Sequence, residues 1–302
     1  MNNKSKSFTQ IVLLLSLALF IVLPIYSQST KVYVSAHPDD WQLFMNPNAY
    51  EDLQNPENKV IFLHTTAGDA GSGTGNTSYY LAREEGSLRA IRFLCNAINN
   101  ELKQGNEMSK TQVLINNHLI LRISYANAVA YFLRLPDGNY TGVGYPIHDN
   151  MSLKKLYEGT ISSMSAIDNS TQYHSLDDLI DTISEIVAYE TDNIEQISFN
   201  IAETDSTINP EDHSDHLNTS FIMQKVAHNL GMKSVRLYEE YATNSKPVNI
   251  FDDDFLICAG TWGATASGLS DNYHDSTWND SHNVWIGRQY FRDVLLSDIK
   301  KE

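Results

Sequence analysis

The stretch Lys31-Val-Tyr-Val-Ser-Ala-His-Pro-Asp-Asp40 joins an apolar segment directly to a cluster of titratable side chains. The β-branched and aromatic residues of its first half predict a buried strand. Pro38 restricts the residue before it to extended geometry, so His37 should continue the direction of the strand. Asp39 and Asp40 then face different sides of a turn, where one carboxylate can bind a metal and the other can act as a base. A capped turn with an incidental histidine is the alternative interpretation.

Segments typical of strands alternate with segments typical of helices along the chain. Strands are expected at Lys31–Ala36, Lys59–Thr66, Leu119–Ser124, Ala128–Leu135, Gln196–Ala202, Val235–Tyr241 and Phe255–Ala259. Helices are expected at Tyr79–Asn99, Leu176–Glu190 and Leu217–Leu230. This alternation predicts an α/β fold with a mostly parallel sheet and helices on both of its faces.

A second cluster, His213-Ser214-Asp215-His216, follows the expected strand Gln196–Ala202 and a short loop. His213 and His216 lie at a helix start, close enough to address one site, and Asp215 could orient an imidazole. In parallel sheets, ligands bind beyond the carboxyl ends of the strands, where both clusters are expected. Hydrolytic zinc needs about three His or carboxylate ligands, an open position for water and a carboxylate that takes the proton. The two clusters together therefore predict a metal-dependent hydrolase site, although solvated loop histidines would explain the second cluster alone.

These clusters resemble the LmbE/PIG-L family of metal-dependent N-acetylglucosaminyl deacetylases. The resemblance includes Thr65-Thr66-Ala67-Gly68-Asp69-Ala70-Gly71 after the second strand and Arg83-Glu84-Glu85-Gly86 at a helix start, and it extends over residues 31–240. It implies a Rossmann-like three-layer α/β fold. It also implies zinc-dependent hydrolysis of the acetamido group of an N-acetylglucosamine-containing glycan or glycoconjugate.

The resemblance further implies a role for each motif residue. His37, Asp40 and His216 correspond to metal ligands, and Asp39 corresponds to the general base. His213 corresponds to a general acid that also helps to stabilise the tetrahedral intermediate. Zinc is the metal expected for these ligand types, and another divalent ion could use the same ligands.

Three further residues are candidates for substrate contact. Trp41 stands where the family usually has Glu, so local packing and the sugar subsite are expected to differ. Arg83 could hold a sugar hydroxyl or a phosphate, although an exposed Arg at a helix start more often makes ordinary ion pairs. His274 belongs to a C-terminal part, residues 241–302, that is expected on the substrate side.

Within that C-terminal part, the stretch Thr261–Trp285 is rich in Gly, Asn, Asp and aromatic side chains, which include Trp262, Tyr273, His274, Trp278, His282 and Trp285. Exposed aromatic rings beside polar groups suit the apolar face and the hydroxyl rim of a sugar. A cover over the edge of the core is the alternative interpretation.

The N-terminal residues predict export. Lys4 and Lys6 precede the apolar run Ile11–Ile25, and Ser27 follows as a small-residue cleavage point, so residues 1–27 are expected to be a signal peptide. Residues 28–302 are then expected to form one catalytic domain in the periplasm or outside the cell. The apolar run is shorter than the roughly 20 residues of a membrane span, so no stable membrane insertion is expected after cleavage. An uncleaved N-terminal anchor is the alternative.

Charge and cysteine content limit the remaining classes of function. The 302 residues carry a formal net charge of −16, and such an acidic surface repels nucleic acid and anionic membranes. Two cysteines exclude a disulfide-dense small scaffold. The expected partner is an N-acetylated amino sugar or glycan. Hydrolysis of a non-sugar amide and binding of carbohydrate without catalysis are the two alternatives.

Overall fold

The computed structural model describes residues 29–75, 77–98, 107–191 and 196–299. The expected signal peptide therefore lies outside the described residues. Among the described helices, none combines the length and the apolar character that crossing a membrane requires.

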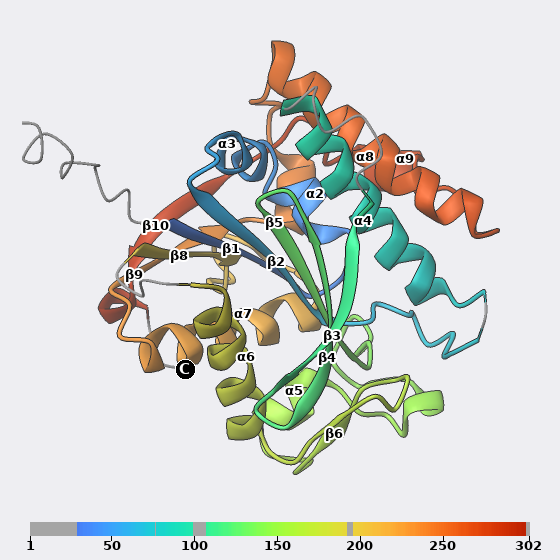
Figure 1. The fold of residues 1–302 in the computed structure, drawn as a ribbon, viewed down its shortest axis with the longest axis vertical. Coiled ribbons are helices and arrows are strands. Elements are labelled where there is room, and N and C mark those ends of the chain that lie inside the picture. Colours follow the sequence, from blue (N-terminus) through green and yellow to red (C-terminus); the bar gives the residue numbers. More distant parts are fainter. Residues whose placement is uncertain (1–28, 76, 99–106, 192–195, 300–302) are drawn as a thin grey trace, which may run out of the picture.

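A central sheet of eight strands organises the molecule (Figure 1). From edge to edge its strands are β10 (Phe291–Leu295), β9 (Ser234–Tyr238), β8 (Ile197–Ala202), β1 (Ser29–Ser35), β2 (Asn58–Thr66), β5 (Ala128–Leu135), β4 (His118–Tyr125) and β3 (Ser109–Ile115). The pairs β9–β8, β8–β1, β1–β2 and β2–β5 are parallel, and the pairs nearer the edges are antiparallel. The expected mostly parallel α/β sheet, consistent with a Rossmann-like three-layer fold, is confirmed.

Helices cover both faces of this sheet (Figure 1). One face is covered by α2 (Asp40–Phe44), α3 (Asn48–Gln54), α4 (Tyr79–Ile98) and α8 (Asp252–Asp271). The other face is covered by α6 (Leu176–Glu190) and α7 (Ser214–Asn229), with α5 (Leu153–Tyr157) against α7. The smaller elements are β6 (Met164–Ser165), β7 (Gln172–Tyr173), α9 (Asp280–Asn283) and the 3₁₀ helices Pro146–His148, Tyr241–Ser245 and Leu296–Asp298.

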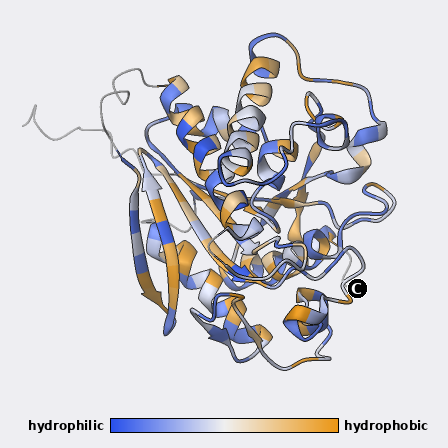
Figure 2. Ribbon diagram, turned by 90° about the vertical axis from the view of Figure 1, so that its right-hand side faces the viewer, coloured by the Kyte–Doolittle hydropathy of each residue, from blue (hydrophilic) through white to orange (hydrophobic). Residues whose placement is uncertain are grey.

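Alternate residues of the central strands belong to two separate cores. In β1, Val32 and Val34 pack in the core on the α6 and α7 side, whereas Tyr33 packs in the core on the other face. Leu63 and Phe62 of β2 divide in the same way. Successive side chains of a strand point to opposite faces, so strands this apolar need helices on both sides. Figure 2 shows hydrophobic residues on strands of the sheet and on the sides of helices that pack against it.

Local patterns located the central strands of the sheet and the helices α4, α6 and α7. The expected strand Ala128–Leu135 and the expected helix Leu176–Glu190 have the same bounds in the structure, and Ser175 caps the helix by accepting from the backbone N–H of Asp178 at 3.0 Å. The expected strand Val235–Tyr241 is shorter and ends at Tyr238. Asn99, the expected last residue of α4, lies outside the described residues.

The expected strand Phe255–Ala259 is wrong, because these residues lie within α8. A short apolar run fits a strand and a buried helix equally well. Here it belongs to a helix that continues to Asp271. The buried positions of α8 recur at three- and four-residue spacing, which is the period of a helix with one covered face. They include Cys258, Thr261, Trp262, Thr265 and Leu269.

Two glycines bring α8 directly onto α4. A Cβ atom at Gly86 of α4 would lie 2.7 Å from the carbonyl oxygen of Thr265, and one at Gly268 of α8 would lie 2.4 Å from the backbone nitrogen of Gly86. Only residues without a side chain permit this approach of the two backbones. The contact holds the C-terminal part of the chain on the face of the sheet that carries α2.

Trp41 of α2 lies inside that core. Its side chain is fully buried, its ring centroid lies 4.4 Å from that of Phe62, and its Nε1–H donates to Ser87 Oγ at 3.0 Å. The expectation that Trp41 contacts a substrate is therefore wrong in this structure, because no part of the side chain reaches a surface.

We expect Trp41→Ala to lower the free energy of unfolding by about 3–5 kcal/mol, the usual cost of truncating a buried aromatic residue. Urea unfolding followed by circular dichroism measures the change. The control is Trp278→Ala, where the side chain is 48% exposed; this variant should stay within about 0.5 kcal/mol of the natural protein. Equal losses in the two variants would contradict the buried role of Trp41.

Candidate metal centre

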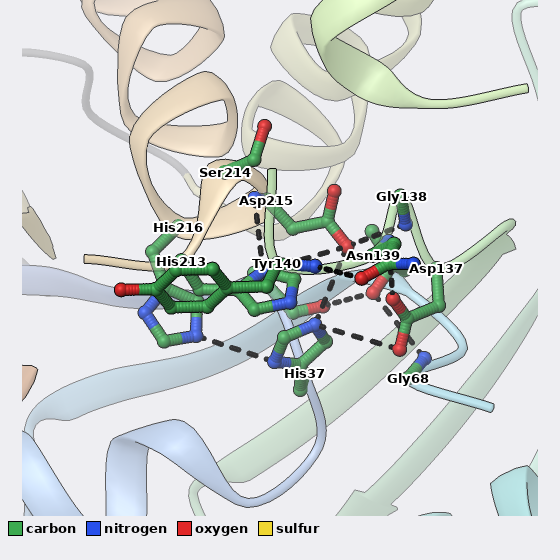
Figure 3. A network of polar contacts seen from close by, with 12 residues as sticks. His37, Gly68, Asp137, Gly138, Asn139, Tyr140, His213, Ser214, Asp215 and His216 are labelled. Carbon is green, nitrogen blue, oxygen red and sulfur yellow. Dashed lines mark hydrogen bonds and ion pairs between the residues drawn. The ribbon is translucent and has the colours of Figure 1, made fainter. Parts of the chain in front are cut away.

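Parallel pairing brings the two distant motifs to one edge of the sheet. β1 and β8 are neighbours, with Tyr33 opposite Asn200, so their carboxyl ends lie side by side. The segment His37–Asp40 follows β1 and leads into α2, while His213–His216 follows β8 and opens α7. Figure 3 shows His37 between the residues of the second motif and the loop that contains Asp137.

Three of the expected ligand atoms form a nearly equilateral triangle. His37 Nδ1 lies 3.5 Å from Asp40 Oδ1 and 3.2 Å from His216 Nε2, and the third side, from His216 Nε2 to Asp40 Oδ1, is 3.4 Å. Zinc bonds of about 2.0–2.1 Å in tetrahedral geometry place two ligand atoms about 3.3 Å apart. The triangle therefore fits a zinc-sized ion. His213 also brings a ring nitrogen within 4.8 Å of the nitrogens of His37 and His216.

The imidazole of His37 is held by a carboxylate on its outer side. Its Nε2 lies 3.4 Å from Asp215 Oδ2, which also accepts the backbone N–H of Gly138 at 2.8 Å. Because an ionised carboxylate only accepts, the neutral ring of His37 carries its hydrogen on Nε2 and turns its Nδ1 lone pair to the triangle. This contact places Asp215 where the sequence motif expected it, beside an imidazole.

His216 is held by two carboxylates. Its Nδ1 lies 2.9 Å from Asp212 Oδ1 and 2.5 Å from Glu240 Oε2, and all three side chains are buried. Burial raises the pKa of Glu240 to about 7, although His216 opposes that shift. Two carboxylates on one ring nitrogen give His216 a strongly negative surrounding, which favours a cation on its other nitrogen.

Sequence reasoning missed three of these acidic residues. Asp137 lies directly beyond β5 with its Oδ2 4.0 Å from His37 Nε2, and its position after an expected strand is a signal that could have located it. Asp212 directly precedes the second motif. Glu240 lies beyond the end of β9 and carries no local signal, because only the pairing of β9 with β8 brings it to His216.

The buried charges of the centre shift the pKa values of its two histidines and of Asp40. Burial opposes protonation of His37, but Asp40 and Asp215 outweigh it and raise its pKa to about 10. The pKa of His216 is raised well above its usual value because Asp40, Glu240 and Asp212 outweigh burial. Burial would raise the pKa of Asp40, yet His216 and His37 hold it well below its usual value. The triangle therefore binds protons strongly when it holds no metal.

Asp39 lies beside the triangle and pairs with Arg83. Its Oδ1 accepts from Nη2 of Arg83, whose Nη1 donates to the carbonyl oxygen of Gly68 at 2.6 Å. Gly68 has φ +55°, and a Cβ there would lie 2.4 Å from Arg83 Nη1, so the loop needs a glycine at this position. Asp39 Oδ2 makes no hydrogen bond within the described residues, and this leaves one carboxylate oxygen for a water molecule. Arg83 is buried and serves as an ion-pair partner of the expected base.

His213 caps the start of α7. Its Nδ1 accepts the backbone N–H of Asp215 at 3.1 Å, so the neutral ring carries its hydrogen on Nε2. Burial and then the charges of His37 and His216 lower the pKa of His213. Its ring centroid lies 4.7 Å from that of His37. His213 therefore brings an N–H donor to the centre.

His274 lies farther from the metal ligands. Its Nε2 is 2.7 Å from the carbonyl oxygen of Thr77, and its ring centroid is 5.4 Å from that of Tyr79. Arg83 also lies over the ring of Tyr79, with its guanidinium carbon 5.5 Å from the ring centroid. The structure thus connects His274 to the Asp39 side of the centre through two side chains, and its contact with substrate stays a prediction.

Comparison with known proteins returns structural neighbours only. No protein-family model matches the chain, and no curated protein matches it. The zinc-inhibited form of teicoplanin deacetylase Orf2 is 13% identical, with a TM-score of 0.42, over 80% of this chain and 85% of that chain. N,N'-diacetylchitobiose deacetylase from Pyrococcus horikoshii is 14% identical, with a TM-score of 0.45, over 98% of this chain and 95% of that chain. Similarity this low does not establish the activity of this chain.

We expect zinc affinity to rise with pH between pH 6 and pH 8. The pKa of His37 is raised to about 10 and that of His216 is raised well above its usual value, so zinc must displace protons from these ligands. Each displaced proton raises the logarithm of the association constant by about one per pH unit. Competition with a chromogenic chelator at three pH values measures the slope. His216→Ala should abolish binding and the exposed control His174→Ala should not; a slope of zero would contradict protonated ligands.

We expect Asp215→Asn to weaken zinc binding about 10- to 100-fold, because outer carboxylates orient ligand imidazoles and raise their basicity. The same chelator competition at pH 7 gives the affinity. Asp253→Asn is the matched control, since Asp253 is an exposed residue of α8. Unchanged affinity in Asp215→Asn, with the protein folded, would show that His37 needs no carboxylate on its outer side.

Proposed function

We propose that the protein is an exported, zinc-dependent de-N-acetylase that hydrolyses the acetamido group of an N-acetylglucosamine-containing glycan or glycoconjugate. One observation carries the hydrolase proposal, namely the triangle of His37, Asp40 and His216 beside a carboxylate, Asp39, with one oxygen unengaged. This set provides ligands for a metal and a separate base. The resemblance of the two motifs to N-acetylglucosaminyl deacetylases supports the choice of bond and substrate. The charged and apolar pattern of residues 1–27 supports export.

Asp39 is proposed to take the proton of the attacking water. When bound by His37, Asp40 and His216, a divalent metal supplies Lewis acidity, which polarises an amide carbonyl and lowers the pKa of water. Arg83 holds Oδ1 of Asp39, so the carboxylate keeps its orientation while Oδ2 receives the proton. Asp40 and Asp39 thereby perform different tasks although they are adjacent in sequence, because only Asp40 contacts the two imidazoles.

His213 is proposed to stabilise the negative charge that develops on the carbonyl oxygen. Its cap contact with Asp215 fixes the ring and leaves Nε2–H as a donor, and preorganised donors of this kind contribute strongly in dry sites. The departing amine also needs a proton. In the role that the family resemblance implies, His213 passes its Nε2 hydrogen to the amine nitrogen and receives in its place the proton that Asp39 took from water, so the ring stays neutral and the reaction balances.

We expect Asp39→Asn to lower kcat for acetate release about 10²- to 10⁴-fold, the usual contribution of a general base, while zinc content stays unchanged. Substrates are N-acetylglucosamine, its β-linked oligomers and a set of non-sugar acetamides. Asp181→Asn, an exposed change on α6, is the matched control.

Acetate from the sugars alone supports the proposed substrate class. Acetate from the non-sugar acetamides alone would retain the hydrolase and reject the sugar. Zinc binding without acetate from any of these substrates would reject the proposal, and so would an Asp39→Asn protein as active as the control.

A further inference from the structure

The C-terminal part of the chain adds three partly buried rings to the metal centre. We name Tyr241, His282 and Trp285 the aromatic wall. The Tyr241 ring meets the metal-ligand candidate His216 edge-on, with centroids 5.0 Å apart and planes at 80°. Trp285 stacks on Tyr241 with centroids 5.1 Å apart and planes at 18°. The aromatic wall therefore begins at a proposed metal ligand and extends outward from it.

Neighbouring side chains fix the orientation of these rings. Phe44 of α2 packs edge-on against Trp285 at 5.5 Å, and Trp285 Nε1–H donates to the carbonyl oxygen of Tyr241 at 3.3 Å. His282 lies edge-on to Trp285 at 6.2 Å, and its Nδ1 lies 2.9 Å from Asn279 Oδ1. The wall is thus a rigid surface contributed by two segments of the C-terminal part and supported by α2.

Two polar atoms of the wall have no hydrogen bond within the described part of the chain. They are the hydroxyl oxygen of Tyr241 and Nε2 of His282. Tyr241 and His282 are both partly exposed residues. An aromatic face with free polar atoms at its border is the combination that binds the apolar face and the hydroxyl rim of a pyranose.

Trp262 performs the alternative task of closing the core. It is fully buried, it stacks on His282 at 5.7 Å, and its Nε1–H donates to Asn283 Oδ1 at 3.1 Å. Tyr241 and Trp285 also pack against this core, but they are only partly buried, so each keeps an exposed part that Trp262 lacks. Trp278, by contrast, is 48% exposed, so it serves as a control for an exposed indole.

Building on the proposed function, we infer that the aromatic wall is a sugar subsite that holds the pyranose ring beside the acetamido group under attack. The ring's apolar face lies against the wall, and its hydroxyls meet Tyr241 Oη and His282 Nε2. The wall therefore selects an amino sugar or a glycan over other acetamides. The metal centre itself does not make this selection, because its ligands and base act on any amide.

Zinc-loaded full-length protein provides the test, with N,N'-diacetylchitobiose and its longer oligomers as substrates. Trp285→Ala should raise KM about three- to tenfold, as expected for loss of an aromatic stacking contact, with kcat within about twofold. Trp285→Phe should recover part of the affinity. His282→Ala should raise KM without loss of zinc, and Trp278→Ala should change neither constant. Zinc content and the unfolding midpoint of each variant identify failures of folding.

Calorimetric binding of the same oligomers to Asp39→Asn separates the subsite from the reaction. Weaker binding after Trp285→Ala or Trp285→Phe is added to Asp39→Asn supports the wall. This result would stand even if the natural protein released no acetate and the proposed function failed. Acetate release with KM unchanged in the Trp285 and His282 variants overturns the wall and leaves the proposed function standing. Absence of both sugar binding and acetate release overturns both.

Discussion

Parallel pairing of β1 with β8 is the constraint on which the candidate site depends. It sets the carboxyl ends of two strands from opposite halves of the chain side by side, so that His37 and His216 meet with their ring nitrogens 3.2 Å apart. Pairing of β8 with β9 then adds Glu240, and pairing of β2 with β5 adds Asp137. The acidic partners of the two imidazoles thus lie beyond the carboxyl ends of neighbouring strands, which is where parallel sheets bind their ligands.

Concentration of charge is the second physical feature of the centre. Asp40, Asp212, Asp215 and Glu240 are all buried within contact of two imidazoles. Removing carboxylates from water is costly unless cations or hydrogen-bond donors replace it. Protons on the imidazoles provide that compensation in the metal-free protein, and a bound divalent cation would provide it in their place.

The C-terminal part contributes more than a cover. Close packing of α8 on α4 at Gly86 and Gly268 anchors it over the face that carries α2. The segments around α8 then place Tyr241 and Trp285 against Phe44 and next to His216. In the proposed function, the motif-bearing part holds the reacting groups and the C-terminal part shapes the space beside them. Bond chemistry and substrate choice would then belong to different segments of one chain.

By itself the sequence located the five central strands β9, β8, β1, β2 and β5, the strand β4 and the helices α4, α6 and α7, because strand alternation and helix period are local properties. It also contained the two motifs around His37 and His216, whose role as metal ligands stays a prediction. It misplaced Phe255–Ala259, since a short apolar run fits a strand and a buried helix equally. Tertiary structure alone decided that Trp41 is buried, that Arg83 pairs with Asp39 and that Glu240 reaches His216. These contacts join residues on different elements, and only the packing of strands and helices brings such residues within bonding distance.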